Sequence, residues 1–209
     1  MAEESNWMTR KHNQRGFSLI EMLIVITILL IMVWMGSMVM MPMLQQSHVA
    51  NAYNTTLATM RLGRQVAIAK RTVVSVTLSN AAIPNTITVK DTNPTNPTTI
   101  ETVQLPNDVS FDAEPTLPNT VATTPDNFGT GAPAISFDMG VAPGVPNVVY
   151  FYPDGSAQDI ANNINNGVVY IARPGVVMSS KAITLWGATG RLRGWTLITV
   201  GATKTWIQQ

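Results

Sequence analysis

The apolar run at residues 17–41 constrains this chain more than any other feature of its sequence, because Glu21 is the only charged residue in it. About 20 consecutive apolar residues form a helix long enough to cross the hydrocarbon layer of a membrane. We therefore expect residues 17–41 to form a transmembrane helix. We also expect this helix to find no packing partner within its own chain.

The residues before the run predict its orientation. Arg10, Lys11 and Arg15 precede it, and basic residues favour the cytoplasmic side of a membrane. A single-pass protein with an exported C-terminal domain follows, with residues 1–16 as a basic leader and Met8 as an alternative start. A conventional secretory signal is the other interpretation, but its apolar region spans about 7–15 residues and ends at small residues.

Residues 42–71 predict an amphipathic helix. Pro42 lacks a backbone donor, so we expect a kink or local fraying there. Beyond it, apolar residues recur at helical spacing on one face, while polar residues occupy the other. The face expected to pack against a sheet is formed by Ala50, Tyr53, Leu57, Met60 and Ala67.

Residues 72–209 predict a β-rich domain, since short runs of branched and aromatic residues alternate with turn signals. The expected strands are 72–79, 86–90, 99–105, 109–111, 134–139, 148–152, 168–172, 182–186 and 191–200. Segments 91–97 and 113–133 are rich in Pro, Thr and Asn, and we expect them to be long surface loops outside the core. The expected fold class is therefore α+β, with a long N-terminal helix packed by its second half on antiparallel sheets.

Composition argues against an enzyme. The chain has no cysteine, and its two histidines, His12 and His48, precede the β domain. Histidine-dependent catalytic triads and His/Cys metal sites are thus excluded there, and we expect no catalytic residue, cofactor or metal. Asp154 and Asp159 raise the alternative of calcium, but such loops need more oxygen ligands, and we interpret Asp154 as a turn former.

Glu21 is unusual because a carboxylate deep in hydrocarbon costs about 2.5–3.5 kcal/mol on insertion scales. One interpretation is that it reaches the headgroups from its position near the membrane surface. The other requires cleavage after Gly16, which would leave a free amine on Phe17, roughly one helical turn from Glu21. In a bundle of such helices the amine of one chain could pair with the Glu21 of its neighbour, so the acid would favour assembly and set the register.

The residues around this junction resemble a known signal. Gly16, Phe17 and Glu21, behind a basic leader and before a spanning apolar run, resemble the class III signal of type IV pilins and of type II secretion pseudopilins. The resemblance implies a pilin-like fold, cleavage between Gly16 and Phe17 by prepilin peptidase, N-methylation of Phe17, and Glu21 as the assembly glutamate. It also implies an inner-membrane protein that assembles with other pilins or pseudopilins on an inner-membrane platform, with its C-terminal domain in the periplasm.

Three segments of the remaining chain resemble the GspH/FimT family. They are the apolar strand and Pro-Asp-Gly turn at 149–156, the Thr-Gly-Arg-x-Arg stretch at 189–193, and the helix end at 61–71. Gly63 departs from the alanine usual at its position in that family. The resemblance implies a minor pseudopilin of a type II secretion system or a minor pilin of a type IV pilus, and it leaves open which of the two branches applies.

Arg191 and Arg193 are candidate DNA-binding residues. Alternate residues of a strand point to the same side, and two guanidinium groups there would suit phosphates. In the FimT branch such a motif is linked to DNA uptake. The alternative is an ordinary solvated strand face, because the formal net charge of the whole chain is only +1 and the basic leader accounts for it.

Overall fold

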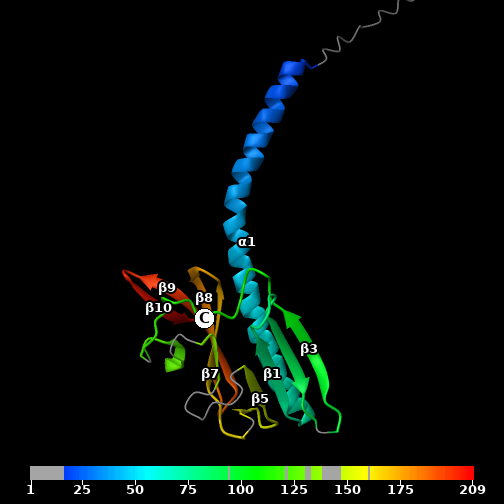
Figure 1. Ribbon diagram of the computed structural model, residues 1–209, viewed down its shortest axis with the longest axis vertical. Helices are drawn as coiled ribbons and strands as arrows, with labels where there is room; N and C mark the ends of the chain where they lie inside the picture. Colours follow the sequence, from blue (N-terminus) through cyan, green and yellow to red (C-terminus); the bar gives the residue numbers. More distant parts are fainter. Residues whose placement is uncertain (1–16, 94, 121, 130–132, 138–146, 160) are drawn as a thin grey trace, which may run out of the picture. The chain divides into compact units, whose positions relative to one another are not determined.

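The computed structural model describes residues 17–209 except 94, 121, 130–132, 138–146 and 160 (Figure 1). The expected leader, including Gly16, lies outside the described residues. The chain divides into two compact units, Met1–Met43 and Leu44–Gln209. Each unit is described by itself below.

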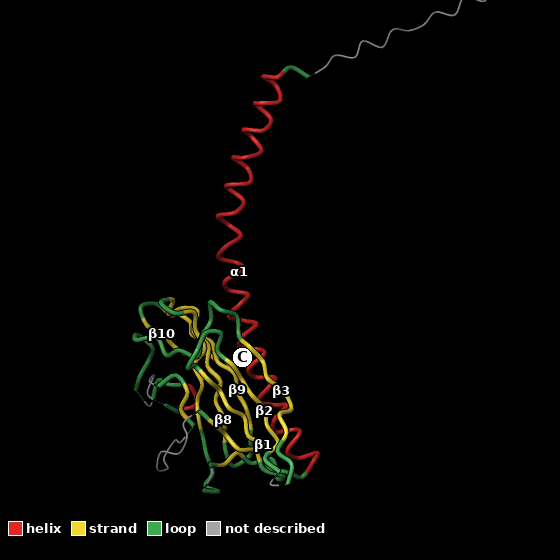
Figure 2. Tube along the Cα trace, turned by 45° about the vertical axis from the view of Figure 1, so that its right-hand side comes forward, coloured by secondary structure: helices red, strands yellow, loops and turns green. Residues whose placement is uncertain are grey.

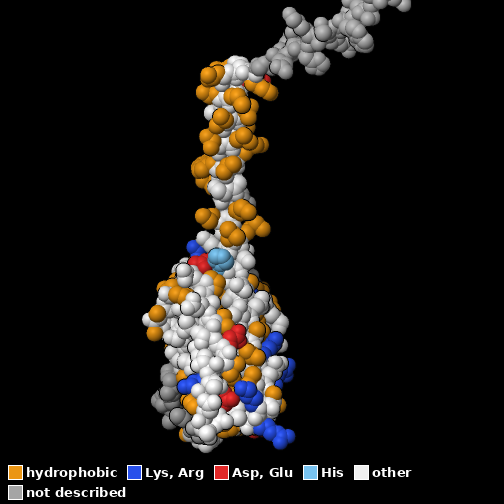
Figure 3. Space-filling view, turned by 90° about the vertical axis from the view of Figure 1, so that its right-hand side faces the viewer, with side chains coloured by type: hydrophobic (Ala, Val, Ile, Leu, Met, Phe, Trp, Pro, Cys, Tyr) orange, Lys and Arg blue, Asp and Glu red, His pale blue; other side chains and the backbone are white. Residues whose placement is uncertain are grey.

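One helix, α1, extends from Leu19 to Lys70 and continues past Pro42, although the proline itself donates no backbone hydrogen bond. Of the described helices, it is the one long and apolar enough to cross a membrane. Its first part is covered with apolar side chains (Figure 3). Most of them are more than half exposed, for example Leu30 at 63% and Trp34 at 63%.

The second part of α1 has the amphipathic character predicted for it. Tyr53, Met60 and Ala67 are buried, whereas Arg61 and Gln65 on the other face are exposed. The helix runs alongside β1, β2 and β3 (Figures 1 and 2). It ends at Lys70, and Arg71 follows with a left-handed backbone at φ 55°, as is common where a helix terminates.

The strands form two antiparallel five-stranded sheets, with orders β3-β2-β1-β5-β6 and β10-β9-β8-β7-β4. The first sheet contains β1 (Val74–Ser79), β2 (Thr86–Asp91), β3 (Thr98–Gln104), β5 (Val148–Phe151) and β6 (Ala157–Gln158). The second contains β4 (Ile135–Ser136), β7 (Gly167–Arg173), β8 (Val176–Trp186), β9 (Arg191–Val200) and β10 (Thr203–Gln208). The expected α+β arrangement of a long apolar helix followed by antiparallel sheets is confirmed.

The turn after β5 forms as its sequence predicts. Asp154 accepts hydrogen bonds from the backbone N–H of Ser156 at 2.9 Å and from its hydroxyl at 2.7 Å. Gly155 has φ 84°, which is unfavourable for a residue with a β-carbon. These hydrogen bonds hold the pKa of Asp154 below its ordinary value.

Strand β7 is buried on both faces, so the second sheet contributes to two cores. Val169 and Ile171 belong to the core shared with α1 and the first sheet. Val168 and Tyr170, which alternate with them, belong to a second cluster. The members of that cluster are Leu117, Phe128, Val168, Tyr170, Ala182, Leu197 and Trp206.

The second cluster corrects one expectation. Segment 113–133 is not only a surface loop, because Leu117 is 5% exposed and Phe128 is 9% exposed. Glu114 is also buried, and its carboxylate accepts a hydrogen bond from the backbone N–H of Gly175. The segment also holds a short 3-10 helix, η1 (Pro125–Asn127). Its residues Leu117 and Phe128 pack with Val168 and Tyr170 of β7, on the opposite side of that strand from Val169 and Ile171.

Several strand boundaries also differ from those predicted. Residues 109–111 form only a single bridge, between Ser110 and Ala172. Strands β6 and β10 were not predicted, and β8 begins at Val176 instead of 182. Strand β10 lies at a sheet edge and buries only Trp206, so it lacks the alternating apolar pattern that identifies a strand in sequence.

Candidate functional site

The N-terminal site predicted from sequence lies at the start of α1. Phe17 and Ser18 precede the helix, and Glu21 falls in its first turn. The carbonyl of Ser18 accepts hydrogen bonds from the backbone N–H groups of Glu21 at 3.0 Å and Met22 at 3.2 Å. A carboxylate in the first turn is favoured by the partial positive charge of the helix terminus.

The surface around Glu21 is apolar and exposed. Phe17, Leu19 and Ile20 are 76%, 84% and 65% exposed, and large apolar side chains continue to Leu44. This surface must be covered by lipid or by other protein, because so large an exposed apolar area is unfavourable in water. Residues 17–44 thus have the apolar surface expected of a membrane anchor, with one acid, Glu21, near its start.

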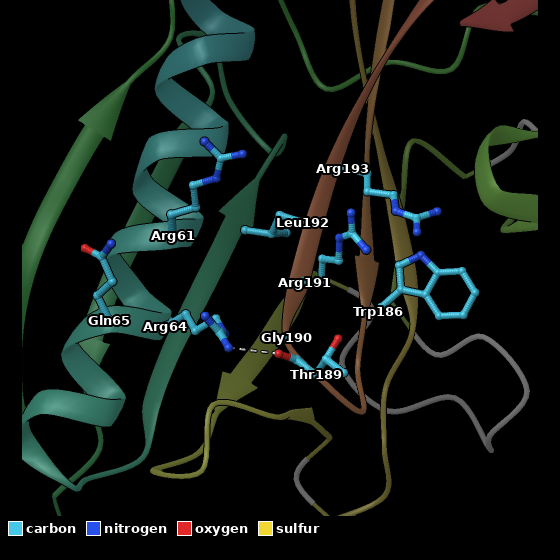
Figure 4. A pocket seen from close by; sticks show the side chains of 9 residues that line it. All are labelled: Arg61, Arg64, Gln65, Trp186, Thr189, Gly190, Arg191, Leu192 and Arg193. Carbon is cyan, nitrogen blue, oxygen red and sulfur yellow. Dashed lines mark hydrogen bonds between the residues drawn. The ribbon is translucent and has the colours of Figure 1, made fainter. Parts of the chain in front are cut away.

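A second candidate site is a groove of about 610 Å³ in the unit Leu44–Gln209. It lies between α1, which contributes Arg61, Arg64 and Gln65, and the end of the β8–β9 hairpin (Figure 4). The hairpin contributes Trp186, Thr189, Gly190, Arg191, Leu192 and Arg193. Four of the nine lining residues are arginines and none is acidic.

Two glycines near this groove lie where a β-carbon would collide with a neighbouring element: Gly63 of α1 against β1, and Gly190 of the β8–β9 hairpin against the turn after β5. A β-carbon on Gly63 would come within 2.5 Å of a methyl group of Val76. A β-carbon on Gly190 would come within 2.1 Å of the carbonyl oxygen of Gly155, and Gly190 has φ 59°. Gly63, which departs from the resembled family, is therefore required by close packing in this chain.

Arg64 ties the helix to two turns. Its Nε donates to the carbonyl of Gly155 at 3.1 Å, and its Nη2 donates to the carbonyl of Thr189 at 3.0 Å (Figure 4). Both acceptors are neutral carbonyl groups, so these two hydrogen bonds do not compensate the charge of the guanidinium. Arg64 thus holds the helix to both turns, and it also adds positive electrostatic potential to the groove.

Arg193 is paired with an acid that sequence analysis did not identify. Its Nη1 lies 2.7 Å from Oδ1 of Asp126, whose side chain is only 5% exposed. Oδ2 of Asp126 accepts hydrogen bonds from the indole of Trp186 at 3.0 Å and the hydroxyl of Thr184 at 2.5 Å. Asp126 has a left-handed backbone at φ 53°, a conformation that Asp and Asn tolerate better than most residues.

The other candidate DNA-binding residue, Arg191, differs in its surroundings. It begins β9 and is exposed, as is Arg61 on the helix wall of the groove. Among the described residues, neither guanidinium lies within ion-pair distance of a carboxylate. The structure therefore brings Arg191 and Arg193 to one groove, and it adds Arg61 and Arg64, which sequence analysis had not connected with them.

Comparison with known proteins identifies the N-terminal signal. Residues 11–37 match the family model described as "Prokaryotic N-terminal methylation motif". No curated protein and no solved structure matches the chain. The motif, together with the long apolar helix and the antiparallel sheets that follow it, indicates a membrane-anchored type IV pilin-like or pseudopilin protein.

Proposed function

We propose that this chain is a minor pseudopilin, a non-enzymatic structural subunit of a type II secretion pseudopilus that takes part in protein export. The observation that carries the proposal is the methylation motif at 11–37, which overlaps α1, a helix whose exposed apolar surface continues to Leu44. The GspH/FimT-like segments at 61–71, 149–156 and 189–193 support the choice of a minor subunit. Its expected location is the inner membrane, with the N-terminus cytoplasmic and the β-rich domain periplasmic.

Glu21 couples membrane insertion to assembly in this proposal. Prepilin peptidase cleaves after Gly16, and the new amine of Phe17 is methylated. When helices pack side by side with an axial offset, the amine of one subunit pairs with Glu21 of its neighbour. A buried charge without its partner is strongly destabilising, so packing in the wrong register is disfavoured. The expected partners are other pseudopilins, the peptidase and the assembly platform.

The test is Glu21→Leu in the full chain, with Thr27→Leu as a matched apolar substitution six residues further along the same helix. Because the chain has no native cysteine, single cysteines placed in α1 report helix-to-helix contacts cleanly by disulfide cross-linking. We expect both variants to insert into the membrane and only Glu21→Leu to lose cross-linked filament ladders. Normal ladders from Glu21→Leu would contradict the register role of the acid.

A second test addresses the maturation step. Mass spectrometry of the mature chain should find a methylated Phe17 at its N-terminus, because the motif directs both cleavage and methylation in this proposal. Replacement of Gly16 by a bulky residue should retain the leader and prevent assembly. A mature chain that still carries residues 1–16 would contradict the proposal independently of Glu21.

A second candidate function is that of a FimT-like minor pilin that binds DNA for uptake. The observation that favours it is the groove lined by Arg61, Arg64, Arg191 and Arg193, with no acid among its described lining residues. Neighbouring genes discriminate the two candidates, because a secretin and secretion ATPase accompany the first and competence genes the second. On the bench, salt-sensitive DNA binding that is lost in the double variant Arg191→Ala, Arg193→Ala supports the second.

A further inference from the structure

We propose that a recess between segment 122–127 and strands β9 and β10 binds a saccharide, with the apolar face of one sugar ring against the indole of Trp195. The recess has a volume of about 390 Å³, and binding sites for small molecules begin at about 300 Å³. Trp195, Trp206 and four threonines are among the residues that line it. It shares no described lining residue with the arginine groove, so the inference goes beyond both candidate functions and depends on neither.

The strand register places the two indoles on one face of the second sheet. Trp195 of β9 lies opposite Gln208 of β10, and Trp206 lies opposite Leu197. Trp195 and Trp206 are therefore diagonal neighbours on the same face, within reach of one ligand, because diagonal pairs are separated by about 7–8 Å. Trp206 is only 8% exposed, whereas Trp195 is half-buried. Trp195 is thus the more accessible indole, and Trp206 lies deeper.

Hydrogen bonds hold the ring of Trp195 in place before a ligand arrives. Its Nε1–H donates to the hydroxyl of Thr184 at 3.0 Å, and this hydroxyl donates in turn to Asp126. Asp126 is paired with Arg193. A side chain that is already ordered loses little conformational entropy on binding. The network therefore favours an aromatic contact at Trp195, and it leaves the carboxylate of Asp126 with a compensated charge.

Trp206 carries an unpaired donor. Its Nε1 is buried and has no hydrogen-bond partner among the residues that the structure describes, while its ring packs against Tyr170 with the centroids 5.8 Å apart. A buried N–H group without an acceptor is unfavourable, and buried polar groups are nearly always hydrogen-bonded. A hydroxyl oxygen of a ligand seated beside this indole would supply the acceptor. We therefore expect Trp206 to donate a hydrogen bond to the saccharide that Trp195 contacts.

The chemistry of the lining favours a saccharide. Threonine hydroxyls and the amide of Asn127 surround the two indoles. Lys204 is hydrogen-bonded to the carbonyl and the hydroxyl of Thr116, and it is the one cation among the described lining residues, so an anion finds little to pair with. A sugar ring has an apolar C–H face that packs against the negative face of an aromatic ring, and its hydroxyl groups suit neutral polar side chains. A purely apolar ligand would leave those side chains desolvated without partners.

The experiment is saturation-transfer NMR of cellotriose with the full chain, in micelles of a detergent that has no sugar group and so does not compete. Saturation passes from the protein to the ligand protons that contact it. We expect the C–H protons on one face of a sugar ring to receive the most saturation, because that face packs against Trp195. A titration with cellotriose gives the affinity.

Substitutions separate the ring of Trp195 from the donor of Trp206. We expect Trp195→Leu to weaken binding about tenfold, because the contact with an aromatic face is lost, and Trp195→Phe to retain most of the affinity. Trp206→Phe keeps a ring but removes the N–H, and it should weaken binding several-fold. Trp34→Leu, in the other compact unit of the chain, is the matched control. Circular dichroism and the unfolding midpoint of each variant confirm that it is folded before its binding is compared.

The polar side chains of the recess are tested at Asn127, which is exposed and has φ 61°. Asn127→Gly removes the amide and suits the left-handed backbone, and we expect it to weaken binding several-fold. Asn162→Gly is the control, since Asn162 is also exposed, has φ 65° and does not line the recess. It should bind cellotriose as the wild type does.

The saccharide site is overturned if neither cellotriose nor its α-linked counterpart maltotriose receives saturation at millimolar concentrations, or if folded Trp195→Leu binds as tightly as the wild type. Binding of cyclohexanol as tight as that of cellotriose would also overturn it, because the recess would then be an apolar cavity. Wild-type affinity of folded Trp206→Phe would overturn the hydrogen bond assigned to that residue. These results leave Glu21 and the arginine groove untouched, so failure here is distinct from failure of either candidate function.

Discussion

The phenol oxygen of Tyr53 lies 1.5 Å from the position that a β-carbon on residue 194 would occupy. Tyr53 comes from the buried face of α1, and Gly194 lies in β9 opposite Ile183. The Tyr53 ring also has the ammonium of Lys181 4.9 Å from its centroid. The helix thus rests on the second sheet at a place where only bare backbone leaves room for the phenol.

We expect Gly194→Ala to destabilise the fold by about 3 kcal/mol, because an added methyl group forces Tyr53 and the strand apart. The measurement is urea unfolding of the full chain in detergent. Gly201→Asn is the control, since nothing lies within 4 Å of that site and Asn tolerates a left-handed backbone. Gly194→Ala should cost less free energy of unfolding in a Tyr53→Leu background. An equal loss of stability in both backgrounds would show that the contact with Tyr53 does not cause the destabilisation.

Arg64→Ala should lower the free energy of unfolding by about 1–3 kcal/mol. The substitution leaves the carbonyls of Gly155 and Thr189 without their donor, and each lost hydrogen bond to a charged group is costly. Gln65→Ala, at the adjacent exposed position, should have little effect. Stability of Arg64→Ala equal to that of the control would mean that solvent replaces both hydrogen bonds.

Phe128→Ala should destabilise the chain by about 3 kcal/mol, as expected when a buried aromatic residue is truncated. Phe128 belongs to the second core cluster and packs on Trp186, so tryptophan fluorescence should change in the folded state as well. Asn119→Ala, in the same segment but exposed, is the matched control. Wild-type stability of Phe128→Ala would show that segment 113–133 does not belong to the core.

Asp159 should contribute stability that depends on pH. Its carboxylate accepts hydrogen bonds from the side-chain and backbone N–H groups of Asn163 and from the N–H of Ala161, and these hold its pKa below its ordinary value. The folded state therefore binds a proton less readily than the unfolded state does. The contribution is complete above the unfolded value of 3.8 and is lost as pH falls through the lower folded pKa.

The corresponding measurement is the unfolding temperature of Asp159→Ala against wild type. The variant should unfold at a lower temperature near pH 7, and the difference should narrow towards about pH 2. Ala161→Ser, which keeps the backbone donor, should follow the wild-type curve. A difference that stays constant across this range would mean that the loop loses stability for reasons unrelated to the charge of Asp159.

The sequence predicted the elements whose patterns are local. The spanning run, the buried face with Tyr53 and Met60, and the Asp154 turn depend on spacing within a few residues, and the structure has all three. Most strands were placed within a few residues as well. Strand β10 was missed because an edge strand that buries one tryptophan resembles a polar tail.

The candidate groove was predictable only in part. Arg191 and Arg193 share a motif, so they were found together, but Arg61, Arg64 and Asp126 reach the groove through tertiary packing. Asp126 lies in a segment whose Pro, Thr and Asn content is typical of loops. The only local signal is that Asp126 and Asn127, which both have positive φ, are residue types that favour this conformation. Nothing in their spacing points to Arg193, which is 67 positions away.

The contact between Asp126 and Arg193 has a consequence for how such a subunit could evolve. The acid that neutralises Arg193 belongs to a connecting segment and not to the sheet. A single substitution at position 126 would therefore change the charge of the groove while the strands and their register stay as they are. Under the functions proposed above, ligand affinity could then diversify through changes in the loop, while the helix and sheets would be inherited unaltered.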